Sequence, residues 1–320
     1  MRIREVDFPS TVIEAQRSGQ LVLFAGAGVS KDPPSDYPDF EGLAAQVGGA
    51  AYPKHDGESV EVYLGRLVSS GIKVHDQVRE ILSSPNSAPN SNHFALIDLF
   101  KNLDCFRLVT TNFDRHFATA MSDRFGIAGP EVYFAPALPV GSGFTGIVNL
   151  HGSVDRESYR MVLTDSDFAR AYINEGWATR FLERLFSRFV VLFVGYSHQD
   201  MLMTYLARGL TSGSQGPGRF VLTPPHDDTR WRNLGIAPVH YPISESPQLR
   251  HAQLTIAIGA WAEQCQAGAL AVEKPRPCNC HWECSRLSRR RGFRKRRAFR
   301  HSQAPVLHAI RARSRMVDLG

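Results

Sequence analysis

Six short apolar runs alternate with helix-like segments, and this alternation constrains the fold more than any other feature of the chain. Each run is rich in β-branched or aromatic residues and leads into turn residues. The runs span 20–25, 106–110, 146–150, 190–194, 219–223 and 239–243. Strands that alternate with helices are typical of a parallel sheet buried on both faces. We predict a Rossmann-like α/β fold of about six strands, with helices on both faces and a helical insertion.

The covering helices are predicted from apolar residues spaced three and four apart. This spacing occurs in 10–18, 57–69, 92–101, 113–125, 177–188, 199–210 and 248–265. Residues 30–56 are rich in Pro and Gly and are too long for a tight connection. We predict an ordered loop there, and long ordered loops often bind ligands.

The charge distribution divides the chain into two parts. Its 320 residues are 43% hydrophobic, which is enough for a substantial core. Of the 37 Lys and Arg residues, 14 lie from Lys274 onward, with 2 of the 31 Asp and Glu residues. The net charge is therefore +12 from Lys274 onward and −6 before it. We predict a globular domain over 1–271 and a basic tail over 272–320.

The predicted tail is rich in Cys and Arg and has no apolar periodicity. Cys278, Cys280, His281 and Cys284 are potential zinc ligands, but their spacing is compressed and no second pair follows. The Arg-rich run at 289–297 is of a kind that contacts nucleic acid phosphates. We favour a disordered C-terminal segment. Out-of-frame translation that replaced a downstream domain would produce such a segment. We therefore predict no metal site, and nucleic acid binding only through this tail.

The sequence also favours a cytoplasmic location. No apolar run approaches the roughly 20 residues that span a bilayer, so we expect no membrane association. The N-terminus lacks an apolar stretch followed by a small-residue cleavage site. Only Cys105 and Cys265 precede the tail, which is no disulfide framework and fits a reducing compartment.

A glycine-bearing turn follows the first predicted strand, in the sequence Leu-Val-Leu-Phe-Ala-Gly-Ala-Gly-Val-Ser at 21–30. Such a turn lies at the carboxyl edge of a parallel sheet, where dinucleotides bind. Gly26 and Gly28 would let backbone amides approach a diphosphate, and the Ser30 hydroxyl would add a donor. The alternative is a tight βα turn that needs glycine for a positive φ.

Four further motifs follow in a fixed order, and three of them come after predicted strands. They are Tyr-Pro-Asp-Phe-Glu-Gly at 37–42, Val-Thr-Thr-Asn-Phe-Asp at 109–114, Asn-Leu-His-Gly-Ser at 149–153, and Phe-Val-Gly-Tyr-Ser-His-Gln-Asp at 193–200. From residue 20 to about 265 the chain resembles the sirtuin family. That family carries in succession a Gly-Ala-Gly-x-Ser loop, a Pro-Asp-Phe loop, an Asn-x-Asp turn, a His-Gly and a Gly-x-Ser.

The resemblance implies that NAD is bound, as a substrate. It places the diphosphate on the 26–30 loop and Phe40 near the nicotinamide. Asp114 would bond the nicotinamide carboxamide, and Ser197 would line the ribose pocket. The NAD-binding residues expected in this way are Ala25, Gly26, Ala27, Gly28, Ser30, Phe40, Thr111, Asp114, Gly195, Ser197 and Asp200.

Asn112 and His151 are the catalytic residues that the resemblance implies. Breaking the nicotinamide glycosidic bond passes through a cationic sugar, which needs positioning and nearby acceptors more than a strong acid. A neutral His can take a ribose hydroxyl proton, and an Asn can orient a water or hydroxyl. Simpler alternatives remain: Asn112 would cap a helix starting near Phe113, His151 would make one strand-end hydrogen bond, and Asp200 would begin a helix from 199.

The chain departs from protein-deacylating sirtuins in two places. No cysteine lies between His151 and Cys265, so the zinc ribbon that helps to shape an acyl-lysine cleft looks absent. Glu41 replaces an expected Arg, and we do not assign it to the site. The zinc-less pattern with Gly-Tyr-Ser-x-x-Asp is similar to bacterial sirtuin-like domains that destroy NAD in antiviral defence.

The function expected from this comparison is NAD glycohydrolase, giving nicotinamide and ADP-ribose. Its partners would be NAD and either further copies of the chain or a sensor or effector protein. An NAD-dependent protein deacylase is the alternative enzyme. A non-catalytic module that senses NAD or ADP-ribose is the alternative of another class.

Overall fold

A computed structural model describes residues 1–126, 129–139, 143–197, 216–225, 228–246 and 249–268. The chain divides into two units, Met1–Arg276 and Pro277–Gly320, and all described residues belong to the first. The helix predicted at 199–210 and the tail predicted from 272 lie outside the described residues.

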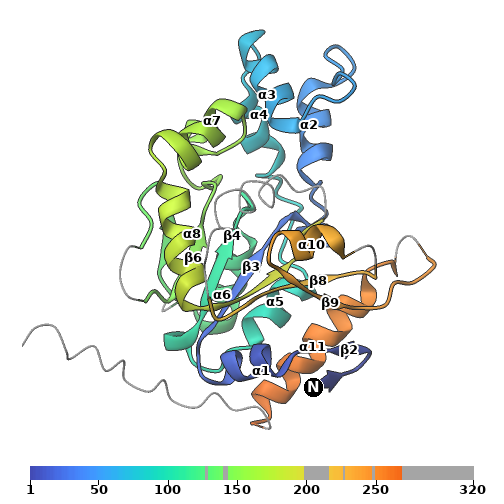
Figure 1. Cartoon of the computed structure of the whole chain (residues 1–320). Coiled ribbons are helices and arrows are strands. Elements are labelled where there is room, and N and C mark those ends of the chain that lie inside the picture. Colours follow the sequence, from blue (N-terminus) through green and yellow to red (C-terminus); the bar gives the residue numbers. More distant parts are fainter. Residues whose placement is uncertain (127–128, 140–142, 198–215, 226–227, 247–248, 269–320) are drawn as a thin grey trace, which may run out of the picture. The chain divides into compact units, whose positions relative to one another are not determined.

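Seven parallel strands form the central sheet, in the order β5-β6-β4-β3-β7-β8-β9 (Figure 1). Their bounds are β3 Leu21–Ala25, β4 Arg107–Thr110, β5 Val132–Phe134, β6 Gly146–Asn149, β7 Val190–Val194, β8 Arg219–Thr223 and β9 Ala237–His240. The predicted parallel α/β fold is confirmed. β3 pairs with β4 on one side and with β7 on the other, so strand order reverses at β3. Open α/β sheets bind ligands outside the carboxyl ends of strands at such a reversal.

Helices cover both faces of the sheet because successive side chains of a strand point to opposite sides. Leu21, Leu23 and Ala25 pack toward one face, whereas Val22 and Phe24 pack toward the other. The first face is covered by α1 (Ser10–Arg17), α5 (Ser91–Asp98), α6 (His116–Phe125) and α11 (Ala252–Gln266). The second is covered by α8 (Trp177–Arg188) and α10 (Thr229–Asn233).

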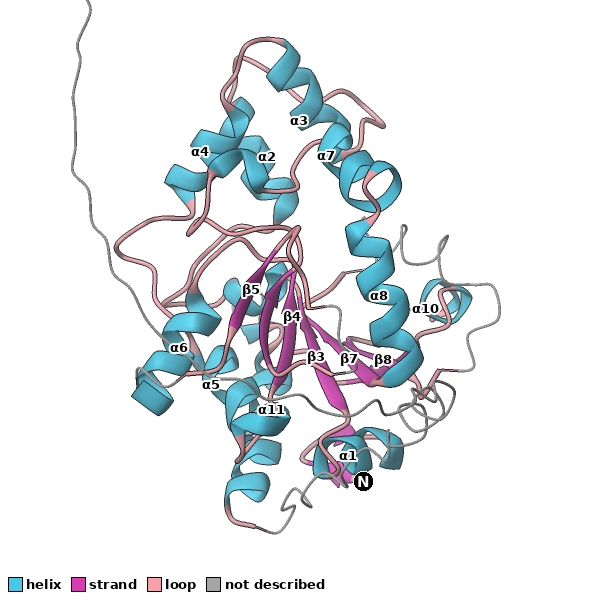
Figure 2. Cartoon of the chain, turned by 90° about the vertical axis from the view of Figure 1, so that its left-hand side faces the viewer, coloured by secondary structure: helices cyan, strands magenta, loops and turns pink. Residues whose placement is uncertain are grey.

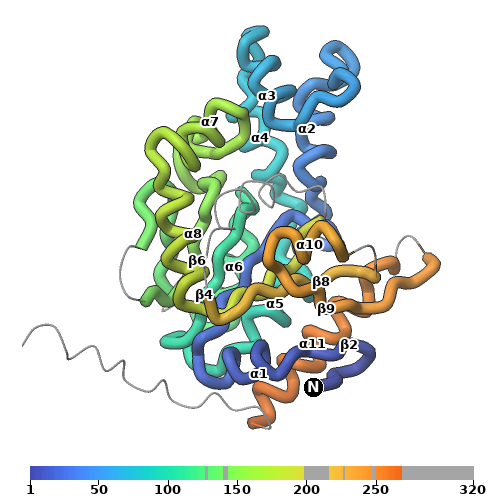
Figure 3. Tube along the Cα trace, in the orientation of Figure 1, coloured from blue at the N-terminus to red at the C-terminus, as the bar shows by residue number. Residues whose placement is uncertain are grey.

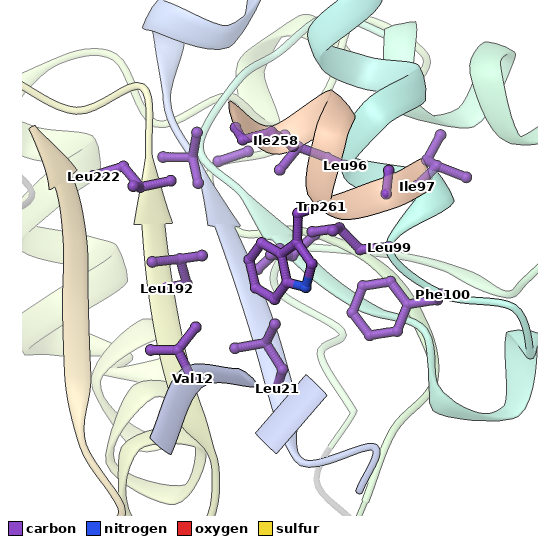
Figure 4. Close-up of a cluster of buried hydrophobic side chains, with 14 of the residues drawn as sticks. Val12, Leu21, Leu96, Ile97, Leu99, Phe100, Leu192, Leu222, Ile258 and Trp261 are labelled. Atoms are coloured by element: carbon purple, nitrogen blue, oxygen red, sulfur yellow. The ribbon is translucent and has the colours of Figure 1, made fainter. Parts of the chain in front are cut away.

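The core of the first face centres on Trp261 of α11, which is fully buried. Figure 4 shows its indole between sheet residues, including Leu21 and Leu192, and residues of α5. The short antiparallel hairpin β1 (Arg2–Ile3) and β2 (Val6–Asp7) lies beside α11 (Figure 3). None of the helices in the described part of the chain has the length and apolar composition of a membrane span.

The predicted helical insertion lies beyond the carboxyl ends of the strands (Figure 2). It contains α2 (Phe40–Gly48), α3 (Val60–Ser69), α4 (Val74–Ile81) and the short α7 (Asp165–Ala169). These helices share a hydrophobic core of their own, built on Leu43, Tyr63 and Leu64. A π-helical turn, Arg170–Asn174, connects α7 toward α8.

The prediction of a loop throughout 30–56 is wrong, because α2 forms within it. Asp39 caps α2 by accepting a hydrogen bond from the Gly42 amide, and Leu43 and Val47 bury one face. The glycines at both ends of this helix concealed its pattern. β5 and α4 were not predicted from the sequence, and β9 begins two residues earlier than predicted.

Candidate active site

A pocket lies between the carboxyl edge of the sheet and the helical insertion, where strand order reverses. It encloses about 710 Å³, including its open mouth. From the sheet edge it is lined by Ala27, Ser30, Thr111, Asn112, Phe113, Asp114, His151 and Tyr196. From the insertion and the 150–170 segment it is lined by Tyr37, Pro38, Phe40, Leu43, Leu82, Val162 and Phe168. One wall is therefore polar and the other is apolar.

The glycine loop after β3 packs directly against the loop after β7. The Gly26 amide donates to Val194 O at 2.9 Å, and the Gly28 amide donates to Gly195 O at 2.9 Å. A Cβ on Gly28 would lie 2.9 Å from Gly195 Cα. Neither Gly26 nor Gly28 has a positive φ, so close approach is the reason for glycine here. Both amides are engaged inside the protein.

Ala27 is the member of this loop that lines the pocket. It is the first residue of a 3-10 turn, Ala27–Ser30, and its amide has no acceptor among the described residues. An amide that opens a helical turn is a good donor to an anion. Of the amides predicted to meet the diphosphate, that of Ala27 is the one that the fold leaves available.

Ser30 is the centre of a buried polar network rather than an open donor. Its hydroxyl donates to Asp114 Oδ2 at 2.9 Å. Since the hydroxyl has one hydrogen, it accepts from Asn112 Nδ2 at 3.2 Å and from His93 Nε2 at 3.2 Å. Ser30 is 2% exposed. Its part in the site is thus to fix the orientation of Asn112 and Asp114.

Asn112 presents its carbonyl oxygen to the pocket. Its backbone amide donates to Thr110 Oγ1 at 3.0 Å, and its side-chain NH2 is held by Ser30. Its Oδ1 has no protein partner in the described part of the chain. The helix-capping alternative for Asn112 is wrong, because α6 begins at His116. Asp114 Oδ1 accepts a hydrogen bond from the His116 backbone amide at 2.9 Å, so Asp114 and not Asn112 bonds the first amide of α6.

His151 is buried at the end of β6 and lines the same pocket. Its Nε2 lies 2.8 Å from the Tyr172 hydroxyl, and its ring meets Phe168 edge-on at 5.2 Å. Burial lowers the pKa of His151 to about 3. The imidazole is therefore neutral near pH 7 and has a lone pair with which to accept a proton. Asn112 and His151, which come from different strands, meet in one pocket.

Acidification is expected to destabilise the fold through its buried histidines. Burial also lowers the pKa of His93, to about 4. An unfolded His has a pKa of about 6.5, so between 6.5 and the folded pKa the unfolded chain binds more protons. The stability from each neutral His is complete above pH 6.5 and is lost as the pH falls. We expect the free energy of unfolding to drop by on the order of 2 kcal/mol per His between pH 7 and 5, measured by urea denaturation. A constant value over this range would contradict the burial of both rings.

The other predicted residues divide into those that face the pocket and those behind it. Phe40, at the start of α2, faces the pocket from the insertion side. Thr111 Oγ1 lies 2.8 Å from the Tyr196 hydroxyl. Ala25 and Gly195 lie behind the lining residues, and Ser197 is exposed and does not line the pocket. Asp200 lies outside the described residues.

Glu41, which was not predicted as a site residue, does not line the pocket. It is 60% exposed and forms an ion pair with Lys54. These two residues lie at a separate small hollow beside α2 and do not line the main pocket.

Three site residues were not found from the sequence. His93 occupies the third position of α5 in an Asn90-x-x-His93 capping box, a pattern that could have identified it. Tyr196 lies inside the quoted Gly-Tyr-Ser motif. No sequence pattern pointed to Tyr172, because its position beside His151 depends on a π-helical turn. Within the described ranges no group of three His, Cys, Asp or Glu side chains forms a metal site.

The fold and the pocket are those of an α/β protein with a pocket at the point where the strand order of a parallel sheet reverses. Residues 107–239 match the family model described as a SIR2-like domain. The resemblance to sirtuins that the sequence predicted is therefore confirmed for this stretch, which includes Asn112 and His151.

Two individual proteins illustrate the similarity. The uncharacterized protein y4cA of Sinorhizobium fredii (strain NBRC 101917 / NGR234) is 28% identical over 225 residues, which are 62% of this chain and 18% of that protein. This chain therefore spans less than a fifth of the length of that relative. A solved structure, "Structural Basis for the Mechanism and Regulation of Sir2 Enzymes", aligns with 13% identity and a TM-score of 0.40, covering 81% of this chain and 100% of that chain.

Proposed function

We propose that this protein hydrolyses NAD to nicotinamide and ADP-ribose. The observation that carries the proposal is the meeting of Asn112 and a neutral, buried His151 in one pocket at the reversal point of the sheet. A SIR2-like domain indicates NAD-related activity. The NAD molecule would lie along the pocket, with its diphosphate at the Ala27 amide and its nicotinamide toward Phe40.

The proposed reaction gives a role to the side chains that face this pocket. The bond between the ribose C1′ and the nicotinamide nitrogen breaks, and its electron pair stays on nicotinamide, which leaves neutral. The Asn112 carbonyl oxygen would orient a water or ribose hydroxyl. Neutral His151 accepts a ribose hydroxyl proton as the sugar becomes cationic. Water then adds to C1′ and releases one proton, and His151 returns its proton to the ribose oxygen. In total, NAD and water give nicotinamide, ADP-ribose and a proton.

The segment after His151 favours hydrolysis over deacylation. Between His151 and β7 the chain forms α7, the π-helical turn and α8, and the sequence has no cysteine there. Phe168 from this segment lines the pocket. This segment thus contributes an apolar ring to the pocket and has no cysteines to form a zinc ribbon that would shape a cleft for acyl-lysine.

We further propose that cleavage is controlled, because unrestrained hydrolysis would exhaust the NAD of the cell. Assembly with further copies or with a sensor or effector protein would supply that control. This is the arrangement expected for antiviral defence in the bacterial cytoplasm. The test of function therefore spans a range of protein concentrations.

Nicotinamide release without any peptide is the expected result of the decisive experiment. Purified protein at several concentrations would be incubated with NAD, with and without an acetyl-lysine peptide, and nicotinamide and ADP-ribose quantified by chromatography. Equal release in both arms supports hydrolysis. Release only with the peptide would show a deacylase. NAD binding by calorimetry without release at any concentration would show a sensor.

A further inference from the structure

Tyr172 contacts His151 from behind the pocket. Its hydroxyl lies 2.8 Å from His151 Nε2, yet Tyr172 does not line the pocket that His151 faces. The other imidazole nitrogen, Nδ1, has no partner among the described residues. A residue that touches His151 and not the pocket acts through the imidazole.

The position of one hydrogen decides what His151 can do. If the Tyr172 hydroxyl donates to Nε2, the imidazole hydrogen lies on Nδ1, which is then a donor. If Nε2–H donates to the Tyr172 oxygen, Nδ1 keeps its lone pair and is an acceptor. Only the second arrangement lets Nδ1 take a proton from a ribose hydroxyl.

We propose that Tyr172 is a positioning residue, which accepts a hydrogen bond from His151 Nε2–H and thereby keeps Nδ1 as the proton acceptor toward the pocket. This inference rests on the proposed NAD hydrolysis for its role in catalysis. Its structural part, the tautomer of His151, is independent of that reaction. The low pKa of His151 agrees with a neutral ring that has one hydrogen to place.

The chain holds Tyr172 firmly in this place. Tyr172 lies within the π-helical turn Arg170–Asn174, a kind of turn that is frequent at functional sites. Its carbonyl oxygen accepts from Thr179 Oγ1 at 2.8 Å, which ties the turn to α8. Its ring stacks on Phe168 with centroids 5.9 Å apart and planes at 13°. Both rings meet His151 edge-on, so the imidazole has little freedom to turn.

The tautomer can be measured directly in the whole protein, without NAD. Histidine labelled with ¹³C and ¹⁵N would be incorporated, and the ring ¹⁵N and Cδ2 shifts of His151 assigned by comparison with His151→Ala. We expect Nε2–H in the wild type. In Tyr172→Phe a buried Nε2–H would lack an acceptor, so the hydrogen should move to Nδ1. An Nδ1–H tautomer in the wild type would overturn the proposal, as would an unchanged tautomer in Tyr172→Phe.

The effect of Tyr172→Phe on kcat and KM distinguishes a role of Tyr172 in positioning His151 from a role in folding. Tyr172→Phe keeps the ring stack, so we expect kcat for nicotinamide release to fall about tenfold with KM within about twofold. The matched control is Tyr241→Phe, which removes a 2.9 Å hydrogen bond to His251 Nδ1 away from the pocket and should leave kcat unchanged. An equal kcat in both variants would overturn the proposal. If the tautomer changes but the wild type releases no nicotinamide, the proposed hydrolysis fails and the placement of Tyr172 stands.

Discussion

His151→Ala is expected to lower kcat for nicotinamide release by about 10²- to 10⁴-fold, the usual contribution of a general base. The neutral imidazole would be lost from the end of β6, and no second histidine lines the pocket among the described residues. The NAD affinity should change little, because the residues expected at the diphosphate and the nicotinamide are separate from His151. Nicotinamide would be measured under saturating NAD, and binding by calorimetry.

The matched control for this experiment is His251→Ala. His251 also bonds a tyrosine hydroxyl, at 2.9 Å, but it lies outside the pocket. Its loss should leave kcat within about twofold of the wild type. Asn112→Ala should resemble His151→Ala, because we propose that both residues act on the same sugar. Equal activity of His151→Ala and His251→Ala would show that His151 is not the base.

The sequence predicted those parts of the fold that depend on local pattern. β3 and β7 are continuous apolar runs, and their five residues were found to within one position. β5 has three half-buried residues at the edge of the sheet and too little pattern to be found. α2 was missed because its glycines suggested a loop, whereas the Asp39 cap and the buried Leu43 decide for a helix.

The site was predictable where each residue follows its own strand. Asn112 and His151 follow β4 and β6, and neighbouring parallel strands bring their carboxyl ends to one edge. Hydrogen bonding inside the site was not predictable. Ser30 was expected to add a donor to a diphosphate, and the sequence did not predict that its hydroxyl bonds Asn112 and Asp114. Such partners depend on contacts between segments more than 80 residues apart, which no local pattern records.

Gly195 is a position where both the fold and the site depend on the absence of a side chain. Gly195 has a φ of +75°, and a Cβ there would lie 2.6 Å from the Val29 backbone nitrogen. Its carbonyl oxygen also accepts the Gly28 amide. The loops after β3 and β7 can therefore approach each other only if residue 195 has no side chain.

Gly195→Ala is expected to lower the free energy of unfolding by about 2–5 kcal/mol. The left-handed backbone contributes about 1–2 kcal/mol of this, and the clash with backbone atoms contributes about 1–3 kcal/mol. The matched control is Gly57→Ala, because Gly57 has nearly the same φ, +74°, and nothing within 4 Å of an added Cβ. It should lose the backbone part alone. Urea denaturation of both variants would separate the two parts, and equal losses would show that the loops can move apart. Separated loops would also displace the Ala27 amide, so any folded Gly195→Ala protein should bind NAD more weakly than Gly57→Ala does.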